Sequence, residues 1–198
     1  MADERIPLRE RKRLATMRRV QTVALDLFDA HGFDEVTVER IAEEAEVSPS
    51  SIYRHFGTKE QLVIWDEFDP GALAAIEEEL EHAPPLEALR KVVEATMRQA
   101  VDSDEARIHR RLRIAFAYPS VEAASALQTY EMAGLIAQVL ARKVGRDPHD
   151  LDIQVVTHAF VGGLLGGLRH WEATDFTTPV EEIFSRPFEV IAQGARLP

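Results

Sequence analysis

The sequence predicts an all-α fold of nine or ten helices. Apolar residues recur at helical spacing in almost every segment between residues 11 and 193. Glycine and proline fall between these segments, where helices start and stop. No alternating pattern of the kind that marks strands stands out. The chain has 198 residues, enough for one or two domains with a buried core.

Composition excludes several classes of protein. Apolar residues make up 45% of the chain and charged residues 29%, as in ordinary globular proteins. The absence of cysteine excludes disulfides, thiolate catalysis and metal sites with cysteine ligands. No run approaches about 18 apolar residues, and the N-terminus lacks the apolar core of a signal peptide. We therefore expect a cytoplasmic protein that does not span a membrane.

The first helix is expected from about residue 11 to residue 30, after an irregular start in which Pro7 discourages a helix. Its apolar face includes Met17, Val20 and Phe28, and Gly32 is a natural left-handed stop. Residues 1–20 hold seven arginines and lysines against three acidic residues, although the whole chain has a net charge of −11. Such a run is usually solvated, but beside the motif that follows we expect it to contact phosphates.

Two short helices joined by a tight turn are expected between Thr37 and Lys59. Thr37 can cap the first helix, and Ser48 can cap the second, with Pro49 in its first turn. Ile52 and Phe56 lie on the inward side of the second helix. Its remaining surface is polar and rich in donors, as a helix in a DNA major groove requires, and carries Ser50, Ser51, Tyr53, Arg54 and His55.

This stretch resembles the helix-turn-helix of the TetR family of transcriptional repressors, over roughly residues 13 to 62. The matching residues are Thr37, Ile41, Ala42, Ala45, Val47, Ser48, Ile52, Tyr53, His55, Phe56 and Lys59. The turn departs from the family at Glu46, where glycine is frequent. The resemblance implies DNA-binding roles, in phosphate contact for Thr37, Ser48, Tyr53, His55 and Lys59 and, by our assignment, in base contact for Ser50, Ser51 and Arg54.

The alternative for Tyr53 is that it packs inside the protein, and the alternative for His55 is that it is a surface residue without a DNA contact.

A fourth helix should open at Thr58 and run to about residue 81. Pro70 should interrupt it near Phe68, either as a hinge or as a simple boundary between two helices. After a linker at Pro84 and Pro85, helices are expected over residues 86–101, 105–118, 120–144, 148–173 and 180–193. The predicted domains are 1–58 for DNA binding and 59–198 for ligand binding and dimerisation.

Large side chains lie on the helices that enclose the ligand pocket in the TetR fold: Trp65, Phe68, Met97, Phe116, Tyr118 and Tyr130. They suit a hydrophobic or aromatic molecule, and they equally suit a plain core. Residues 106–121 are rich in arginine, which indicates either a solvated face or an anion site. Their layout resembles the acyl-CoA-like ligand-binding domain of mycofactocin-type regulators, which implies that Arg110 and Arg113 meet an anionic head group.

Four glycines interrupt the helical pattern of residues 148–173, where each costs about 1 kcal/mol relative to alanine. The stretch lacks the Lys-Ser/Thr ending of a phosphate loop, so close approach of helices is the economical explanation. The TetR resemblance implies a homodimer built by the last two helices. We therefore place Gly162, Gly163, Gly166, Phe184, Phe188 and Ile191 at that interface, the alternative for the glycines being room for a ligand.

No histidine spacing typical of zinc sites and no catalytic triad stands out, so we expect no metal, no cofactor and no enzymatic activity. The resemblance implies a ligand-responsive repressor. Its homodimer would bind a near-palindromic double-stranded DNA operator and be released by a hydrophobic small-molecule inducer, with an acyl-CoA as one candidate. The alternative is a DNA-binding architectural or partner-binding protein whose C-terminal domain is an interaction module without an inducer.

Overall fold

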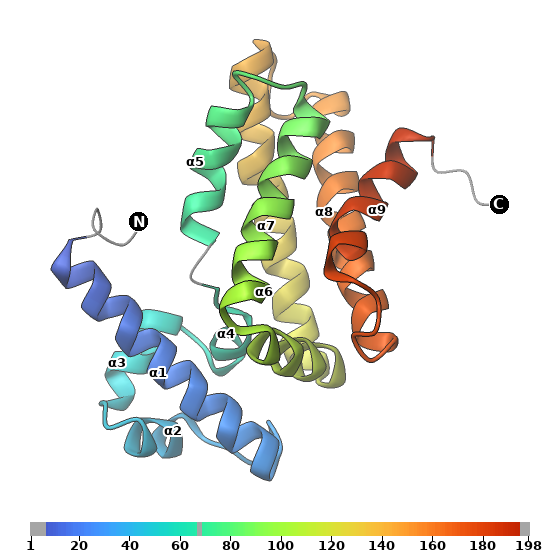
Figure 1. Ribbon diagram of the computed structural model, residues 1–198. Coiled ribbons are helices and arrows are strands. Elements are labelled where there is room, and N and C mark those ends of the chain that lie inside the picture. Colours follow the sequence, from blue (N-terminus) through green and yellow to red (C-terminus); the bar gives the residue numbers. More distant parts are fainter. Residues whose placement is uncertain (1–6, 67–68, 195–198) are drawn as a thin grey trace. The chain divides into compact units, whose positions relative to one another are not determined.

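The structure is a computed structural model that describes residues 7–66 and 69–194, and within these ranges its regular structure is entirely helical (Figure 1). The all-α prediction is confirmed. The helices are α1 (Leu8–His31), α2 (Val38–Glu44), α3 (Pro49–Phe56), α4 (Lys59–Ile64), α5 (Asp69–Glu79), α6 (Pro85–Ala117), α7 (Pro119–Val144), α8 (Leu151–Ala173) and α9 (Val180–Ala192).

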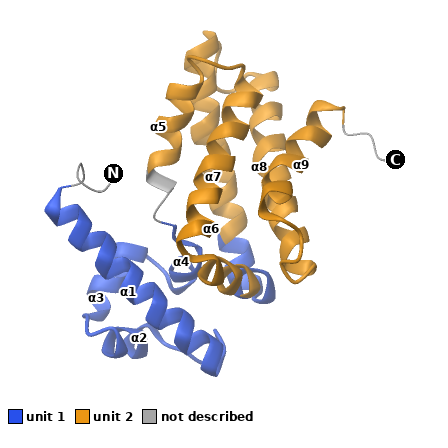
Figure 2. Ribbon diagram, viewed as in Figure 1, with its two compact units in different colours: residues 1–67, 114–124 blue, residues 68–113, 125–198 orange. Residues whose placement is uncertain are grey.

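The chain divides into two compact units (Figure 2). Unit 1 consists of residues 1–67 and 114–124, and unit 2 of residues 68–113 and 125–198. This division differs from the predicted domain boundary after residue 58, because α4 and the corner between α6 and α7 group with the helix-turn-helix. The predicted boundary between functional domains stays a prediction.

The core of unit 1 is built around α1, α2, α3 and α4, with additional residues from the α6–α7 corner such as Ile114 and Val121. Tyr118 belongs to this core: its ring lies 5.3 Å from that of Phe33, and its hydroxyl accepts a 3.2 Å hydrogen bond from the Phe33 amide. Gln21, fully buried on α1, donates to the carbonyls of Leu62 and Trp65. Polar contacts therefore fix α4 and the corner to α1.

Several helix bounds differ from the prediction. α1 begins at Leu8 rather than near residue 11, because Pro7 precedes the helix without interrupting it. The chain leaves α4 after Ile64, well before Pro70, and Phe68 lies outside the described residues. The two helices expected over 86–101 and 105–118 are both present within α6 and are separated by a kink at Asp104, whose backbone is not helical. The Asp104 carboxylate accepts a 3.0 Å hydrogen bond from the Arg107 amide and so caps the second of them.

In unit 2, α8 and α9 pack closely. A Cβ built on Gly163 would lie 3.3 Å from Ile191 Cδ1, and one on Gly167 only 2.8 Å from the Ile183 carbonyl oxygen. Real Cβ atoms essentially never come that close to a backbone oxygen. These two glycines therefore serve contact between two helices of the same chain.

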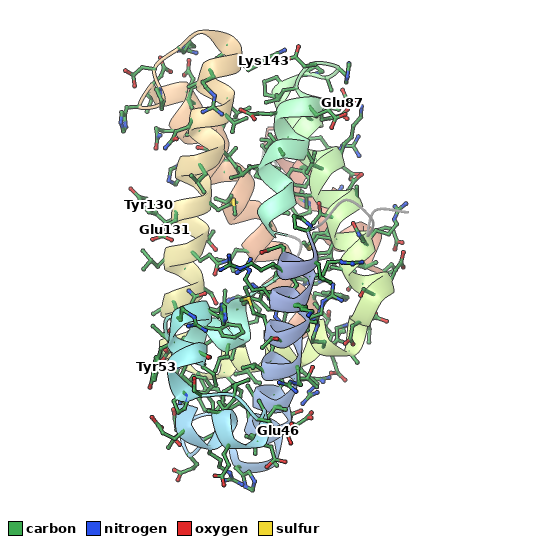
Figure 3. All side chains as sticks on the ribbon, turned by 90° about the vertical axis from the view of Figure 1, so that its left-hand side faces the viewer. Glu46, Tyr53, Glu87, Tyr130, Glu131 and Lys143 are labelled. Carbon is green, nitrogen blue, oxygen red and sulfur yellow. The ribbon has the colours of Figure 1, made fainter. Side chains whose placement is uncertain are left out.

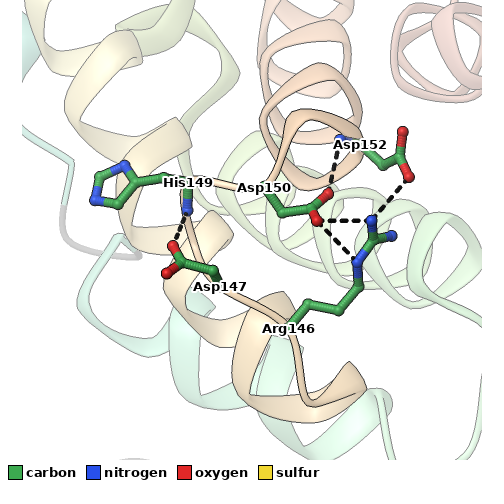
Figure 4. Close-up of polar contacts among 5 residues, drawn as sticks. All are labelled: Arg146, Asp147, His149, Asp150 and Asp152. Carbon is green, nitrogen blue, oxygen red and sulfur yellow. Dashed lines mark hydrogen bonds and ion pairs between the residues drawn. The ribbon is translucent and has the colours of Figure 1, made fainter.

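The start of α8 is fixed by a polar cluster in the preceding turn (Figure 4). The Asp150 carboxylate accepts a 3.0 Å hydrogen bond from the Asp152 amide and caps the helix. The Arg146 guanidinium pairs with both carboxylates, at 2.7 Å and 3.0 Å, and the Asp147 side chain accepts from the His149 amide at 2.7 Å. α8 therefore begins at Leu151, three residues after the predicted start at Pro148.

α8 is also the one helix among the described residues that is long and apolar enough to cross a membrane, with a mean hydropathy of 1.4 over its best window. It is not an unbroken apolar run, since Asp152, Gln154, Thr157 and His158 interrupt it, so the expectation that no run approaches about 18 apolar residues stands. Length and composition alone are weak grounds for a span, because helices that pack against other helices pass the same test. Only 22% of the window is buried within the chain, so α8 exposes much of its apolar surface.

Candidate DNA-binding surface and ligand-binding region

The helix-turn-helix is defined by three side-chain caps. Thr37 Oγ1 accepts from the Arg40 amide at 3.2 Å, Ser48 Oγ from the Ser51 amide at 3.2 Å, and Thr58 Oγ1 from the Gln61 amide at 3.3 Å. Each cap satisfies an amide that would lack a partner inside its helix. The two predicted caps, Thr37 and Ser48, are confirmed, and Thr58 caps the helix that was expected to open there. Gly57, with a φ of 80°, follows the last residue of α3.

Glu46 holds the turn between α2 and α3 in a left-handed conformation, with a φ of 52°. The next amide, that of Val47, donates to the Ala42 carbonyl at 2.9 Å and closes the turn. A left-handed conformation costs a residue with a Cβ about 1–2 kcal/mol, whereas glycine adopts it freely. This geometry explains why glycine suits the position and shows that the departure at Glu46 leaves the motif intact.

One face of α3 is available to a partner. Ser50, Tyr53 and Arg54 are exposed on it, three or four residues apart, and Tyr53 projects outward in Figure 3. Ser48 Oγ lies 2.9 Å from the hydroxyl oxygens of both Ser50 and Ser51, and the Arg54 guanidinium donates to Ser51 Oγ at 3.3 Å. The face thus combines hydroxyls, a phenol and a guanidinium, which are groups that read base edges and bind phosphates.

His55 and Lys59 are placed differently from the other predicted contacts. His55 is half-buried against Met17 and Val20 of α1, and burial, aided by nearby Arg54 and Arg13, lowers its pKa. In the protein without DNA, this environment favours the neutral imidazole, which can still donate one hydrogen bond to a phosphate.

The Lys59 ammonium donates to the carbonyls of Phe33 and Val36, at 2.9 Å and 3.2 Å, and lies 4.2 Å from the centroid of the Phe33 ring. Two of its three N–H groups thus tie the loop after α1 to the start of α4. Among the described residues Lys59 has no third acceptor, which leaves one N–H for another partner.

Basic side chains continue along α1. Arg9, Arg11, Lys12 and Arg19 are exposed on it, whereas Arg5 lies outside the described residues. A 2.6 Å ion pair joins Arg13 to Glu10, and this hydrogen bond lowers the pKa of Glu10. Because α1 begins at Leu8, these charges stand on an ordered helix within unit 1.

The residues predicted for the ligand site divide between the two units. Trp65 and Tyr118 pack in the core of unit 1, where Trp65 lies edge-on to Phe56. Tyr130 is 66% exposed on α7 (Figure 3) and lies 5.5 Å from the His158 ring. Met97 packs beside Trp171 and Phe184, and Phe116 is half-buried. The prediction failed to separate core aromatics from lining aromatics, because helical spacing is the same for both.

A small cavity of about 170 Å³ lies between α6 and α9 in unit 2. Its lining residues are Glu94, Arg98, Val180, Glu181, Phe184 and Ser185, none of which we predicted as a ligand contact. Known ligand pockets are usually larger, about 300–1,000 Å³.

Arg113, expected at an anionic head group, has an acidic partner in the chain. Its guanidinium bonds Asp175 at 2.8 Å and lies 4.9 Å from the centroid of the Phe176 ring. Its side chain is 54% exposed, whereas Arg110 is half-buried and also has an interaction partner. The solvated-face interpretation therefore describes Arg113 in this structure, with a partner 62 residues away in the sequence.

Sequence reasoning missed an aromatic cluster beside Arg113, formed by His109 of α6, Trp171 of α8 and Phe176 of the turn after α8. The rings of His109 and Phe176 stack at 3.8 Å, and Trp171 meets both edge-on, at 4.9 Å and 5.3 Å. Burial is the largest influence on His109 and lowers its pKa. No spacing rule connects residues so far apart, so the sequence carries no signal for this cluster.

The residues predicted for the dimer interface divide into two groups. Phe184 and Phe188 are buried in the chain's own core, at 4% and 2% exposure, and Ile191 packs toward Gly163. Gly162 and Gly166 instead face open space on α8. This corrects the prediction for Phe184 and Phe188, which are occupied within one chain, whereas Gly163 and Ile191 stay partly exposed and their place at the interface stays a prediction.

Several large apolar side chains are individually exposed on α7 and α8. Tyr130 of α7 is labelled in Figure 3, and the large apolar residues exposed on these two helices are Leu127, Tyr130, Leu135, Val144, Leu151, Val155 and Val156. We call these residues, with Gly162 and Gly166, the α7–α8 face. Where such side chains form one continuous patch, the patch commonly marks an interaction site. Among the described residues, no group of three or more His, Asp or Glu side chains is arranged to hold a metal ion.

Two protein families match the chain. "Bacterial regulatory proteins, tetR family" matches residues 22–64, and "MftR C-terminal domain" matches residues 83–196. A curated relative, the putative mycofactocin biosynthesis transcriptional regulator MftR of Mycobacterium tuberculosis, is 27% identical over 187 residues, or 93% of each chain.

Solved structures of similar fold agree with the helical architecture. FadR of Thermus thermophilus, a TetR-family repressor crystallised with lauroyl-CoA, is 20% identical with a TM-score of 0.54, over 92% of this chain and 96% of that one. SmeT of Stenotrophomonas maltophilia, in complex with triclosan, is 17% identical with a TM-score of 0.61, over 93% and 95%. At such identities these likenesses concern the fold alone.

Proposed function

Since the chain belongs to the TetR family of bacterial transcriptional regulators and carries an MftR-type ligand-binding C-terminal domain, we propose that it is a repressor that works as a homodimer. Two α3 helices would enter successive major grooves of a near-palindromic operator, about 34–36 Å apart. A hydrophobic small molecule would release the dimer from DNA. Like other regulators of its family, it would act in the cytoplasm.

The observation that carries the proposal is the exposed face of α3. Ser50, Tyr53 and Arg54 share one side of a helix that is capped at its start and stopped at its end. We assign Arg54 to base contact, because a guanidinium can bond guanine O6 and N7 together. We assign Tyr53, and the free N–H of Lys59, to phosphates, which position the helix without reading sequence.

The α7–α8 face supports the homodimer. Its exposed side chains are apolar, and Gly162 and Gly166 would let a second copy of α8 approach closely. We therefore move the proposed interface from the buried Phe184 and Phe188 to this face. Light scattering should find a dimer, and Gly166→Leu should produce a folded monomer, since nothing in the chain occupies the space in front of Gly166.

The operator experiment selects sites from random DNA with the full-length protein and then measures affinity by fluorescence anisotropy. Tyr53→Ala should weaken binding to all selected sites equally. Arg54→Ala should cost about 1–3 kcal/mol, or about 5- to 150-fold, at a site with its preferred base and much less at other sites. Unchanged affinity of both variants at matched salt would remove α3 from the interface.

The inducer has two kinds of support. The matched C-terminal domain is named for MftR, and the fold resembles repressors crystallised with lauroyl-CoA and with triclosan. If an acyl-CoA is the inducer, lauroyl-CoA should release the protein from DNA and laurate should do so far less well. Arg110→Ala with Arg113→Ala should remove most of that difference, because these arginines are the proposed anion contacts.

The small cavity favours a second candidate function. A region without room for a ligand would serve as an interaction module, and the DNA-binding unit would then act without an inducer. Failure of both lauroyl-CoA and triclosan to change operator affinity, together with retained DNA binding, would support this candidate over the first.

A further inference from the structure

The turn between α8 and α9 holds Phe176 against two aromatic rings of unit 2. The Phe176 ring lies flat on the His109 imidazole, at 3.8 Å and with 11° between the ring planes. The Trp171 indole borders this stack and meets both rings edge-on, His109 at 4.9 Å and Phe176 at 5.3 Å. The three rings come from α6, α8 and the turn, so Phe176 occupies a slot whose walls are helices.

The backbone that presents Phe176 is strained. Asp175 and Phe176 are consecutive residues with side chains in the left-handed region, with φ of 49° and 59°. The Phe176 amide donates to the Trp171 carbonyl at 2.8 Å, which holds the turn in this conformation. Such strain persists only where the surroundings impose it, and it is released when the turn opens.

Two buried nitrogen atoms border the slot. Within the described residues, neither Trp171 Nε1 nor His109 Nε2 has a hydrogen-bond partner, and Trp171 is only 1% exposed. Glu105 Oε1 is 3.6 Å from His109 Nε2, which is too long for a hydrogen bond. An indole N–H can only donate, so the group that would satisfy Trp171 is an acceptor oxygen.

A cation stands at the rim of the slot. The Arg113 guanidinium lies 4.9 Å from the centroid of the Phe176 ring and is held by Asp175 at 2.8 Å. If the turn moves away, Asp175 and Phe176 leave together, and Arg113 loses both contacts. Its planar guanidinium would then match a carboxylate, to which it can donate two parallel hydrogen bonds.

We propose that Phe176 is a built-in plug in a binding slot for flat aromatic carboxylates, which the ligand enters by displacing the Phe176 ring from His109 and Trp171. The ligand's ring replaces the phenyl ring on His109, one of its oxygens accepts from Trp171 Nε1, and its charge takes the place of Asp175 on Arg113. This inference rests on the proposed ligand response of the C-terminal region and names the class of ligand.

A plug and a lining residue give opposite results when they are truncated. Removing a side chain that contacts the ligand lowers affinity, whereas removing a plug abolishes a competitor and raises it. Phe176→Ala should therefore bind 2-naphthoate at least about tenfold more tightly than the unmodified protein. Asp175→Asn should also bind more tightly, because asparagine tolerates the left-handed turn but no longer neutralises Arg113.

The experiment titrates 2-naphthoate, by calorimetry and ¹⁵N NMR, into the full-length protein without DNA. The chain has two tryptophans, so two indole N–H signals are expected, and Trp65→Phe assigns them. The Trp171 signal should move and the Trp65 signal should not. Neutral 2-naphthamide should bind at least about tenfold more weakly, and Arg113→Gln should remove that difference. Trp171→Phe, which keeps a ring but loses the N–H, should bind less well.

Arg186→Gln is the matched control for Arg113→Gln, because it removes an exposed guanidinium of the same unit that also pairs with a carboxylate, and it should leave affinity unchanged. Thermal unfolding shows whether Phe176→Ala remains folded, and Phe176→Leu replaces it if it does not. Unchanged or lower affinity in both the Phe176 and Asp175 variants, or a titration that leaves the Trp171 signal in place, would overturn the proposal. Since no DNA is present, either result leaves the operator experiment untouched.

Discussion

The exposed face of α3 and the aromatic cluster of unit 2 hold their functional side chains in opposite ways. Ser50, Tyr53 and Arg54 come from a single helix of eight residues, fixed by caps that lie within a few positions along the chain. His109, Trp171 and Phe176 come from α6, α8 and the turn after α8, and the backbone of that turn is strained. The face of α3 is formed by local structure, which suits the proposed DNA-binding role. The aromatic cluster depends on tertiary packing, which suits the proposed response to a ligand.

The largest test of this contrast is the loss of Trp171. Truncating a buried indole removes apolar contacts and leaves a cavity, so Trp171→Ala should lower the free energy of unfolding by about 3–5 kcal/mol. Hydrogen exchange should show the loss in α8 and α9, while the amides of α2 and α3 keep most of their protection. An equal loss in α3 would mean that the DNA-binding surface also depends on the distant cluster.

A second test compares two neighbouring glycines of α8. Gly167→Ala places a Cβ 2.8 Å from the Ile183 carbonyl, and such overpacking should cost roughly 1–3 kcal/mol in chemical denaturation. Gly166→Ala meets open space in the chain and should stabilise the isolated α8 helix by up to about 1 kcal/mol. Similar losses in both variants would show that the α8–α9 contact is not what distinguishes them.

Glu46 provides a smaller test within the helix-turn-helix. Because it adopts a left-handed conformation, Glu46→Gly should raise the free energy of unfolding by about 1 kcal/mol. The control is Glu43→Gly, an exposed position inside α2, which should lower it by a similar amount. A loss in both variants would contradict the view that Glu46 is the strained residue of a preformed motif.

The smallest effect concerns pH. Burial lowers the pKa of His109 below its ordinary value of 6.5, helped by Arg113 and opposed by Glu105 and Asp175. Below about pH 6.5 the unfolded chain then binds more protons than the folded one. The contribution of His109 to the free energy of unfolding is therefore fully present above about pH 6.5 and is lost as pH falls through the folded pKa. His109→Gln should flatten part of this dependence in thermal unfolding. Since the pKa of His55 is also lowered, His55→Gln separates the contribution of unit 1.

The sequence was sufficient for the helix-turn-helix because its signals are local. Thr37 and Ser48 could each be recognised as a cap, and Thr58 as the start of a helix, from the residues next to them, and all three caps are present. The inward side of α3 was also predictable, since Ile52 and Phe56 are buried. The contacts of Lys59 with Phe33 and Val36 were not, because they join positions more than 20 residues apart.

In unit 2, hydrophobic periodicity predicted the helices but not which surfaces of these helices pack against one another. Periodicity showed that Phe184, Phe188 and Tyr130 lie on helices, yet the first two are buried in the chain and Tyr130 is exposed. Which face of a helix meets its own chain depends on packing between elements, as the glycines of α8 illustrate. The contacts of Phe176 could not be predicted from the sequence, because they depend on a left-handed turn at positions where no glycine marks it.

The membership of residues 114–124 in unit 1 limits how this regulator can be rebuilt as a biosensor. Engineers often exchange sensing modules by joining two genes at a single point, here after α4. A chimaera of that kind would take Ile114, Tyr118 and Val121 from the foreign parent and leave the native Phe33 loop facing the wrong side chains. A functional chimaera would need three junctions, so that residues 114–124 come from the same parent as the rest of unit 1.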